Sequence, residues 1–199
     1  MATVTQSATS GLVPYRLNVD QFRKMIEAGV FPEGAHVELL GGLLVDKMTK
    51  YPPHCIASGQ ARDLLASIVP AGWFVDEEKP IEIGRRSRPE PDIIVVRGRR
   101  HDYRRRPPRP SDLAIVIEVS DSTYLKDRGA KWWRYAAARI LLYWIVNLPK
   151  RQIEVYSDPT GQGRSAVYRA CTIFGEDAEV PVVIDGRECG RIAVRDLLI

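Results

Sequence analysis

Apolar residues recur along this chain at two different spacings, and the change of spacing separates the expected helices from the expected strands. Helical spacing predicts two N-terminal helices, one opened by the capping-box sequence Asn18-Val-Asp-Gln21 and one spanning residues 54–69. Nearly continuous apolar runs at 92–96, 113–119 and 141–147 are typical of central strands that are covered on both faces. The pattern therefore predicts helices that alternate with buried strands.

Shorter patterns complete the expected fold. The Gly41-Gly42 pair between two apolar runs predicts a tight hairpin, because paired glycines tolerate the positive φ angles of such a turn. Asp121-Ser-Thr is positioned to cap a helix that carries Lys131, and this helix joins two of the buried strands as a crossover unit. Further strands are expected at 73–75, 81–83 and 152–156, with two or three more beyond Gly161.

These elements indicate one α/β domain, in which helices flank a mixed central β-sheet and additional strands follow at the C-terminal end. We expect this domain to span residues 15–199, after a disordered N-terminal lead at 1–14. A chain of 199 residues with 45% hydrophobic and 27% charged residues is typical of one globular domain. No apolar stretch approaches the roughly 20 residues of a membrane span, and the N-terminus lacks the features of a signal peptide.

The three cysteines, Cys55, Cys171 and Cys189, are an odd number and show no CxxC spacing. No histidine cluster lies beside them in the sequence, so the pattern argues against a zinc site. Free cysteines are typical of a reducing compartment, and we therefore expect a cytoplasmic protein.

Positive charge is concentrated in one stretch although the formal net charge is only +4. Between residues 85 and 109 there are ten arginines against three acids. Guanidinium groups match phosphate oxygens, and clustered cations gain affinity by releasing counterions from a polyanion. We expect nucleic-acid contacts from Arg97, Arg99, Arg100, Arg104, Arg105 and Arg106. The alternative is a proline-rich solvated loop that is basic only for solubility.

Two acids stand on neighbouring apolar runs, and a lysine follows them. Asp92 opens one run, Glu118 lies near the end of the next, and Lys131 falls in the helix behind it. Pairing the two strands would bring both carboxylates to one place, and two hard oxygen ligands favour Mg²⁺ or Mn²⁺. A lysine there could hold a phosphate or the attacking water. Each residue alone could also have an ordinary structural role.

At these residues the chain resembles the Uma family of restriction-endonuclease-like proteins, a bacterial branch of the PD-(D/E)XK nuclease superfamily. The resemblance runs nearly end to end and implies a restriction-endonuclease-like core around a metal-dependent active site. The matching segments are Glu38-Leu-Leu-Gly-Gly, His54, Pro91-Asp92, Glu118-Val-Ser, the spaced set of Asp127, Lys131 and Tyr135, and Leu142-Tyr-Trp-Ile-Val.

The chain departs from the simplest superfamily motif, because Ser120 stands where a lysine would complete Glu-x-Lys. The resemblance implies that Lys131 projects from the adjoining helix into the same space. On a regular α-helix Asp127, Lys131 and Tyr135 would lie along one stripe. Asp127 could instead form an ordinary surface salt bridge with Lys131, and Tyr135 is expected to pack rather than to react.

Two other residues of the resemblance have alternatives that the sequence leaves open. Glu38 could bind the metal directly or through water, or it could be a hairpin residue paired with an arginine. His54 could position water or a phosphate, or it could be held by backbone contacts at the start of its helix. We expect Trp132, Trp133, Tyr143 and Trp144 to be core residues rather than a base-stacking platform.

The sequence therefore predicts a Mg²⁺- or Mn²⁺-dependent endonuclease that hydrolyses phosphodiester bonds, with DNA as the expected substrate. Asp92, Glu118, Lys131 and Glu38 are the expected catalytic residues, and the Val119 carbonyl joins Asp92 and Glu118 as a metal ligand. A homodimer is expected. The rival interpretations are a catalytically silent nucleic-acid-binding module and an interaction protein whose strands after Gln152 build an oligomer.

Overall fold

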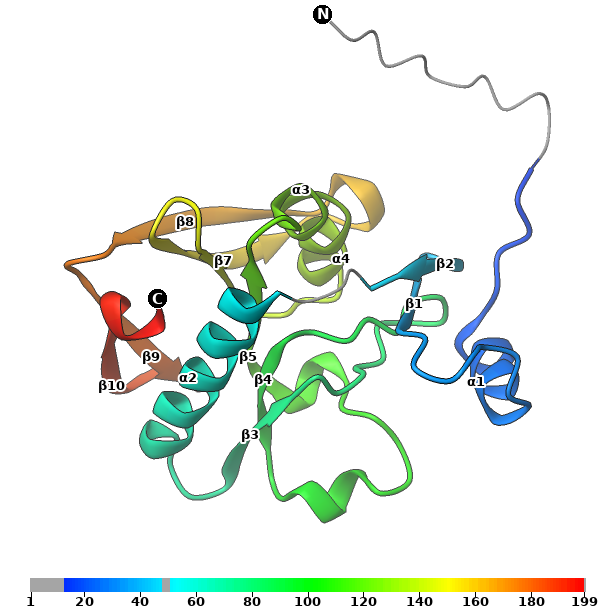
Figure 1. The fold of residues 1–199 in the computed structure, drawn as a ribbon, viewed down its shortest axis with the longest axis horizontal. Helices are drawn as coiled ribbons and strands as arrows, with labels where there is room; N and C mark the ends of the chain where they lie inside the picture. The colour runs from blue at the N-terminus through cyan, green and yellow to red at the C-terminus, as the bar shows by residue number, and fades with distance from the viewer. Residues whose placement is uncertain (1–12, 48–50, 199) are drawn as a thin grey trace, which may run out of the picture.

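The computed structural model of this protein describes residues 13–47 and 51–198 (Figure 1). Most of the lead expected at 1–14 lies outside the described residues. A six-stranded sheet forms the centre, and β5 and β6 are its only parallel neighbours within the described ranges. Its strands, in spatial order, are β3 (Trp73–Glu77), β4 (Ile93–Arg97), β5 (Leu113–Ser120), β6 (Leu142–Asn147), β7 (Gln152–Thr160) and β8 (Val167–Gly175).

Two small hairpins accompany this sheet. The first consists of β1 (Val37–Leu40) and β2 (Leu43–Asp46), and its turn is the predicted glycine pair. Gly41 and Gly42 have φ angles of 62° and 83°, which side chains rarely adopt. The second hairpin consists of β9 (Glu179–Ile184) and β10 (Arg187–Ala193), so three strands follow Gly161.

The helices begin close to where the sequence predicts them. In α1 (Val19–Glu27) the Asn18 side chain accepts from the Gln21 backbone N–H and the Gln21 side chain accepts from that of Asn18, both at 2.9 Å. The second helix, α2 (Pro52–Ile68), starts two residues earlier than expected, because prolines are tolerated in a first turn whose N–H groups have no helical partner. No helix in the described ranges is long and apolar enough to cross a membrane.

The segment between β5 and β6 is helical but irregular. It consists of α3 (Tyr124–Lys126), a π-helical turn at Asp127–Lys131, and α4 (Trp132–Ala137). Thr123, the last residue of the expected Asp121-Ser-Thr cap, occupies the N-cap position, but its hydroxyl donates to the Asp127 carboxylate and does not cap the backbone. The remaining short turns are 3₁₀ helices at Arg100–Tyr103, Pro110–Asp112, Gly163–Ser165 and Val194–Leu197.

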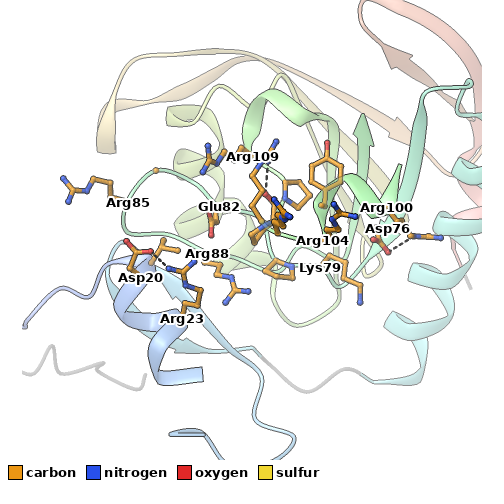
Figure 2. Close-up of a pocket in the computed structure, with 18 of the residues that line it drawn as sticks. Asp20, Arg23, Asp76, Lys79, Glu82, Arg85, Arg88, Arg100, Arg104 and Arg109 are labelled. Atoms are coloured by element: carbon orange, nitrogen blue, oxygen red, sulfur yellow. Dashed lines mark hydrogen bonds and ion pairs between the residues drawn. The ribbon is translucent and has the colours of Figure 1, made fainter. Parts of the chain in front are cut away.

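The expected strand at 81–83 does not form. Ile83 makes only an isolated bridge with Ser87, because the chain turns back on itself at Gly84, where φ is 59°. This connection, the loop after β4 and the start of α1 gather around an open cavity (Figure 2). The long β3–β4 connection therefore lines this cavity and does not add another strand to the sheet.

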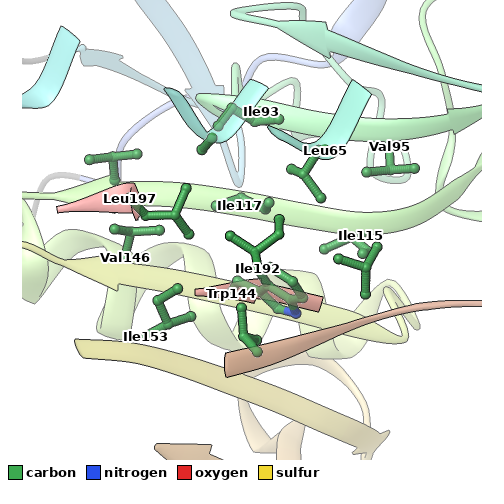
Figure 3. Packing of buried hydrophobic residues seen from close by; sticks show 14 of the residues in the cluster. Leu65, Ile93, Val95, Ile115, Ile117, Trp144, Val146, Ile153, Ile192 and Leu197 are labelled. Carbon is green, nitrogen blue, oxygen red and sulfur yellow. The ribbon is translucent and has the colours of Figure 1, made fainter. Parts of the chain in front are cut away.

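The central sheet is covered on both faces, which explains its apolar strands. On one face α2, β9, β10 and the C-terminal turn pack on residues such as Ile93, Ile117 and Trp144 (Figure 3). On the other face α4 and the β3–β4 connection pack on Ile94 and Val116, among others. Trp144 and Tyr143 are both buried, as expected, and lie in opposite cores. Because β4 and β5 are buried on both faces, the end of the sheet that carries Asp92 and Glu118 is held in a defined position.

Candidate functional site

The register between β4 and β5 brings Asp92 and Glu118 to the same end of the sheet. Ile93 pairs with Ile117, so the next residue outward on each strand is an acid. Residues in register project on the same face, and both side chains line one small pocket. The Val119 N–H donates to Asp92 Oδ2 at 2.9 Å, which ties the two strands together beside the acids.

Lys131 reaches this pair from the helical segment. Its Nζ lies 2.7 Å from Glu118 Oε1 and 3.2 Å from Glu38 Oε1, and the residue is only 2% exposed. Burial disfavours the charged amine, but the surrounding carboxylates, led by Glu118 and Glu38, outweigh it and raise the pKa of Lys131. Lys131 is therefore a buried, permanently charged ammonium rather than half of a surface salt bridge with Asp127.

Glu118 sits at the centre of the site and is itself buried. Burial raises the pKa of Glu118 to about 8, although Lys131 opposes the shift and the nearby acids add to it. The Tyr135 hydroxyl donates to Glu118 Oε1 at 2.8 Å, and the Tyr135 ring packs on Tyr143 with centroids 4.9 Å apart. Tyr135 thus packs, as the sequence suggests, and also contacts the acid.

Glu38 enters from the β1–β2 hairpin, where it has no arginine partner among the described residues. Its Oε2 accepts from Lys126 Nζ at 2.7 Å and its Oε1 accepts from the Glu90 backbone N–H at 2.9 Å. Burial alone would raise the pKa of Glu38, but Lys131 and Lys126 outweigh burial and lower it. Glu38 is therefore an ionised carboxylate next to Lys131.

Two of the described side chains contact Asp92 besides the Val119 backbone. His54 Nε2 lies 3.0 Å from Asp92 Oδ2, and Lys47 Nζ lies 3.5 Å from Asp92 Oδ1. The other ring nitrogen of His54 is buried and has no hydrogen-bond partner among the described residues. The His54 ring thus contacts an acid rather than the backbone among the described residues, and its role in positioning water or a phosphate stays a prediction.

Asp127 is buried behind the site rather than on the surface. Its Oδ2 accepts from Ser120 Oγ at 2.7 Å and from Thr123 Oγ1 at 2.5 Å. Burial raises the pKa of Asp127 against the influence of Lys131. Ser120, which replaces the lysine of the simplest motif, thus anchors the start of the helical segment from which Lys131 projects.

The π-helical turn explains which side chains share a side of this segment. The stripe expected for Asp127, Lys131 and Tyr135 assumes regular α-helical spacing, whereas a π turn bonds residues five apart. Lys126 and Lys131 are five apart, and both contact Glu38. Sequence reasoning did not single out Lys126, because the widened turn leaves no mark in the apolar pattern.

Lys47 was also missed. It follows β2 directly, and its Nζ donates to the Glu90 carbonyl at 2.9 Å as well as approaching Asp92. A lysine at the end of a hairpin is ordinarily a solvated residue, so only the position of the hairpin beside the β4 start reveals its role. Lys47 and Lys126, which the sequence analysis did not predict as site residues, thus each form an ion pair with an acid of the site.

Among the described residues, four buried acids line or contact the site, Glu38, Asp92, Glu118 and Asp127, together with the ammonium groups of Lys47, Lys126 and Lys131. The N–H and C=O of a strand residue point to the same edge, so the Val119 carbonyl is expected on the side of Asp92. These hard oxygen donors fit Mg²⁺ or Mn²⁺ in chemistry. Yet in the described ranges no three His, Cys, Asp or Glu residues are already grouped as metal ligands.

The arginines of the predicted nucleic-acid surface divide into two sets. Arg97 pairs with Asp185 at 2.8 Å and lies over the Trp73 ring, and Arg99 is exposed beside it. The other four line the open cavity in Figure 2, namely Arg100, Arg104, Arg105 and Arg106. Among the described residues, the cavity shares no lining residue with the acidic pocket.

Comparisons with known proteins agree with this architecture. A family model described as "Uma2: Putative restriction endonuclease" matches residues 19–191. A crystal structure of a "putative nuclease belonging to DUF820 from Anabaena variabilis ATCC 29413" superposes with a TM-score of 0.63 at 17% sequence identity. The superposition covers 91% of this chain and 97% of that one, and at this identity it establishes the fold. No curated protein matches the chain.

Proposed function

Because this chain belongs to the Uma2 family of restriction-endonuclease-like proteins, we propose that it is a metal-dependent endonuclease that hydrolyses phosphodiester bonds, with DNA as its substrate. One observation carries the proposal. Two acids from adjacent strands line one pocket, and the ammonium of Lys131 lies 2.7 Å from one of them. Two carboxylates with a fixed cation are the parts that such hydrolysis needs.

We assign Asp92, Glu118 and the Val119 carbonyl as the donors for Mg²⁺ or Mn²⁺, with Glu38 as an outer carboxylate. When bound, the ion polarises the phosphoryl oxygen and lowers the pKa of the attacking water. The hard oxygen donors that these residues bring to one pocket support this assignment. His54 acts as a positioning residue, because it holds the Asp92 oxygen that faces Val119.

Lys131 acts as a fixed positive charge. Its raised pKa favours the protonated amine near neutral pH, which argues for a charge-stabilising role rather than a general base. It orients the attacking water or offsets negative charge on the phosphate in the transition state. Glu38 holds the Lys131 ammonium in position, and Tyr135 holds the Glu118 carboxyl group, through their direct contacts.

The basic segment positions the nucleic acid through its phosphates, and such contacts carry no sequence information. We propose that the enzyme acts in the cytoplasm as a homodimer, because closed twofold dimers are the commonest oligomers of soluble proteins.

One observation favours a second candidate, a silent nucleic-acid-binding module. Lys47 and Lys131 already occupy oxygens of Asp92 and Glu118, so the charges of the site are partly satisfied without a metal. In that case the fold and the basic segment would bind nucleic acid without turnover. Cleavage activity separates the two candidates.

The test incubates the protein with supercoiled plasmid, linear duplex and single strands, in Mg²⁺, Mn²⁺ or EDTA. Glu118→Gln is the test variant, and Glu154→Gln is the matched control, because Glu154 is equally buried but belongs to a separate network with Asn147 and Tyr156. We expect metal-dependent cleavage by the wild type and by the control, and none by Glu118→Gln. Cleavage in EDTA, or cleavage that survives Glu118→Gln, would overturn the proposal.

A further inference from the structure

The largest concentration of positive charge surrounds a cavity of about 750 Å³ that the acidic site does not use (Figure 2). Nine cationic side chains line it, against three acids, Asp20, Asp76 and Glu82. The lining comes from three separate segments: the start of α1, β3 with the β3–β4 connection, and the loop after β4. Its volume is in the range of small-molecule sites rather than of a flat contact surface.

Most of these cations have no acidic partner. Arg23 pairs with Asp20, Arg100 with Asp76, and Arg106 with Asp112, at 2.8, 3.6 and 2.6 Å. The other six form no ion pair within the described ranges: Lys79, Arg85, Arg88, Arg104, Arg105 and Arg109. In addition, Arg88 Nε is buried and lacks a hydrogen-bond partner there. A cavity with this many unpaired cations fits a ligand with several negative charges.

The walls are held in place by backbone hydrogen bonds between the three segments. Val19 N–H donates to the Arg85 carbonyl and Glu82 N–H donates to the Pro108 carbonyl, both at 2.9 Å. Phe74 and Tyr103 add an aromatic pair with centroids 5.9 Å apart. The cavity is therefore preformed, and it offers apolar ring surface beside its guanidinium groups. This combination of cations and rings is typical of sites for unpaired nucleotides.

The cavity lies close to the acidic site along the chain. Arg88 lines the cavity, and Asp92 lines the acidic pocket four residues later, a span of at most about 14 Å. Arg88 also pairs with Leu39, the neighbour of Glu38, through an antiparallel bridge. A nucleic-acid strand that enters the cavity is thus within a few nucleotides of the carboxylates.

We propose that this cavity binds a phosphorylated, unpaired nucleotide of the strand whose phosphodiester bond lies at the acidic site. The inference rests on the proposed nuclease function for the identity of the strand. The unpaired cations hold its phosphates, and the ring surface receives its base. A duplex keeps its bases stacked inside, so it cannot fill the cavity without releasing a nucleotide.

The test measures binding by fluorescence anisotropy in EDTA, so it needs no cleavage. The probes are a labelled, 5′-phosphorylated single strand of DNA or RNA, the matching duplex, and a nucleoside triphosphate as a competitor. The test variant is Arg104→Ala/Arg109→Ala. The control is Arg164→Ala/Arg187→Ala, which removes the same charge from exposed arginines outside the cavity.

We expect the single strand to bind more tightly than the duplex. The cavity variant should weaken it by about 30-fold, on the scale of two lost ordinary hydrogen bonds, and the control by less than about threefold. Equal losses in both variants, or none, would overturn the proposal, as would binding of the nucleoside triphosphate without any binding of the single strand. If the cavity binds the strand but the protein does not cleave it, the cavity site is supported and the nuclease proposal is contradicted. If the protein cleaves DNA and the cavity variant cleaves it equally well, the nuclease proposal is supported and the cavity site is contradicted.

Discussion

The acidic site and the basic cavity are neighbours of opposite charge and opposite construction. In the acidic site every carboxylate is buried and contacts a hydrogen-bond donor or a lysine, whereas six cations of the cavity have no acidic partner in the part of the chain that is described. A cluster of buried acids repels a polyanion unless a cation joins it, and the open cavity attracts one. From this contrast we infer that the two regions have different roles, in which the cavity binds the nucleic acid and the acids bind the metal.

A second contrast, inside the acidic site, is between the two acids that share Lys131. Glu38 and Glu118 both contact Lys131, yet the pKa of Glu38 is lowered while burial raises that of Glu118 to about 8. Glu38 also has Lys126 and a backbone N–H, whereas Glu118 has, among the described residues, only the Tyr135 hydroxyl in addition. Of these two acids, Glu118 is therefore the one whose charge is less compensated.

The largest effect is expected from Lys131→Met, which removes the cation between these two acids. Leaving buried carboxylates without their partner should lower the free energy of unfolding by about 3–5 kcal/mol and abolish cleavage. Lys126→Met is the control, because Lys126 is more exposed and Glu38 would keep Lys131. Urea unfolding checks the difference, and equal stabilities of the two variants would contradict the central position of Lys131.

The next effect concerns pH. Because the folded pKa of Glu118 is raised from 4.5 to about 8, its protonated form stabilises the fold at low pH, and this contribution is lost as pH rises through about 8. Glu118→Gln cannot ionise, so in EDTA its melting temperature should exceed that of the wild type by several degrees at pH 8 and by less at pH 5. If the melting temperatures of the two proteins differ by the same amount at pH 5 and pH 8, burial does not penalise the Glu118 charge.

A smaller effect is expected at His54, which touches the acid rather than the metal. His54→Ala should weaken Mn²⁺ binding about 10- to 100-fold, the usual cost of removing a group behind a metal ligand. His36→Ala serves as the control, because His36 is exposed and outside the pocket. Unchanged affinity in His54→Ala would reduce the ring to a packing residue.

The smallest effect sharpens the cavity side of the comparison. Charge reversal of Arg104, Arg105 and Arg106 should flatten the log–log dependence of DNA affinity on salt, on every sequence tested. Arg106 is already paired with Asp112, so most of the change should come from the other two, a slope reduction of about 1.8. An unchanged slope would return these arginines to a role in solubility.

The sequence predicts the central elements because their patterns are local. A few neighbouring residues are enough to predict each of these elements: the capping box at Asn18, the Gly41-Gly42 turn and the apolar strands β4 and β5. The strand expected at 81–83 fails because Gly84 lets the chain fold back, which outweighs two isoleucines. Lys47 and Lys126 could not be predicted, because their partners lie 45 and 88 residues away and depend on the hairpin position and a π turn.

Calorimetric titration of Mn²⁺ at pH 8 tests most directly whether the acidic site holds a divalent cation. We expect the wild type to bind Mn²⁺ and the Glu154→Gln control to bind it equally. Glu118→Gln should bind it more than about 100-fold more weakly, since it loses a ligand rather than a group behind one. Absence of binding to the wild type, or equal binding by Glu118→Gln, would contradict the assignment of these acids as a metal site.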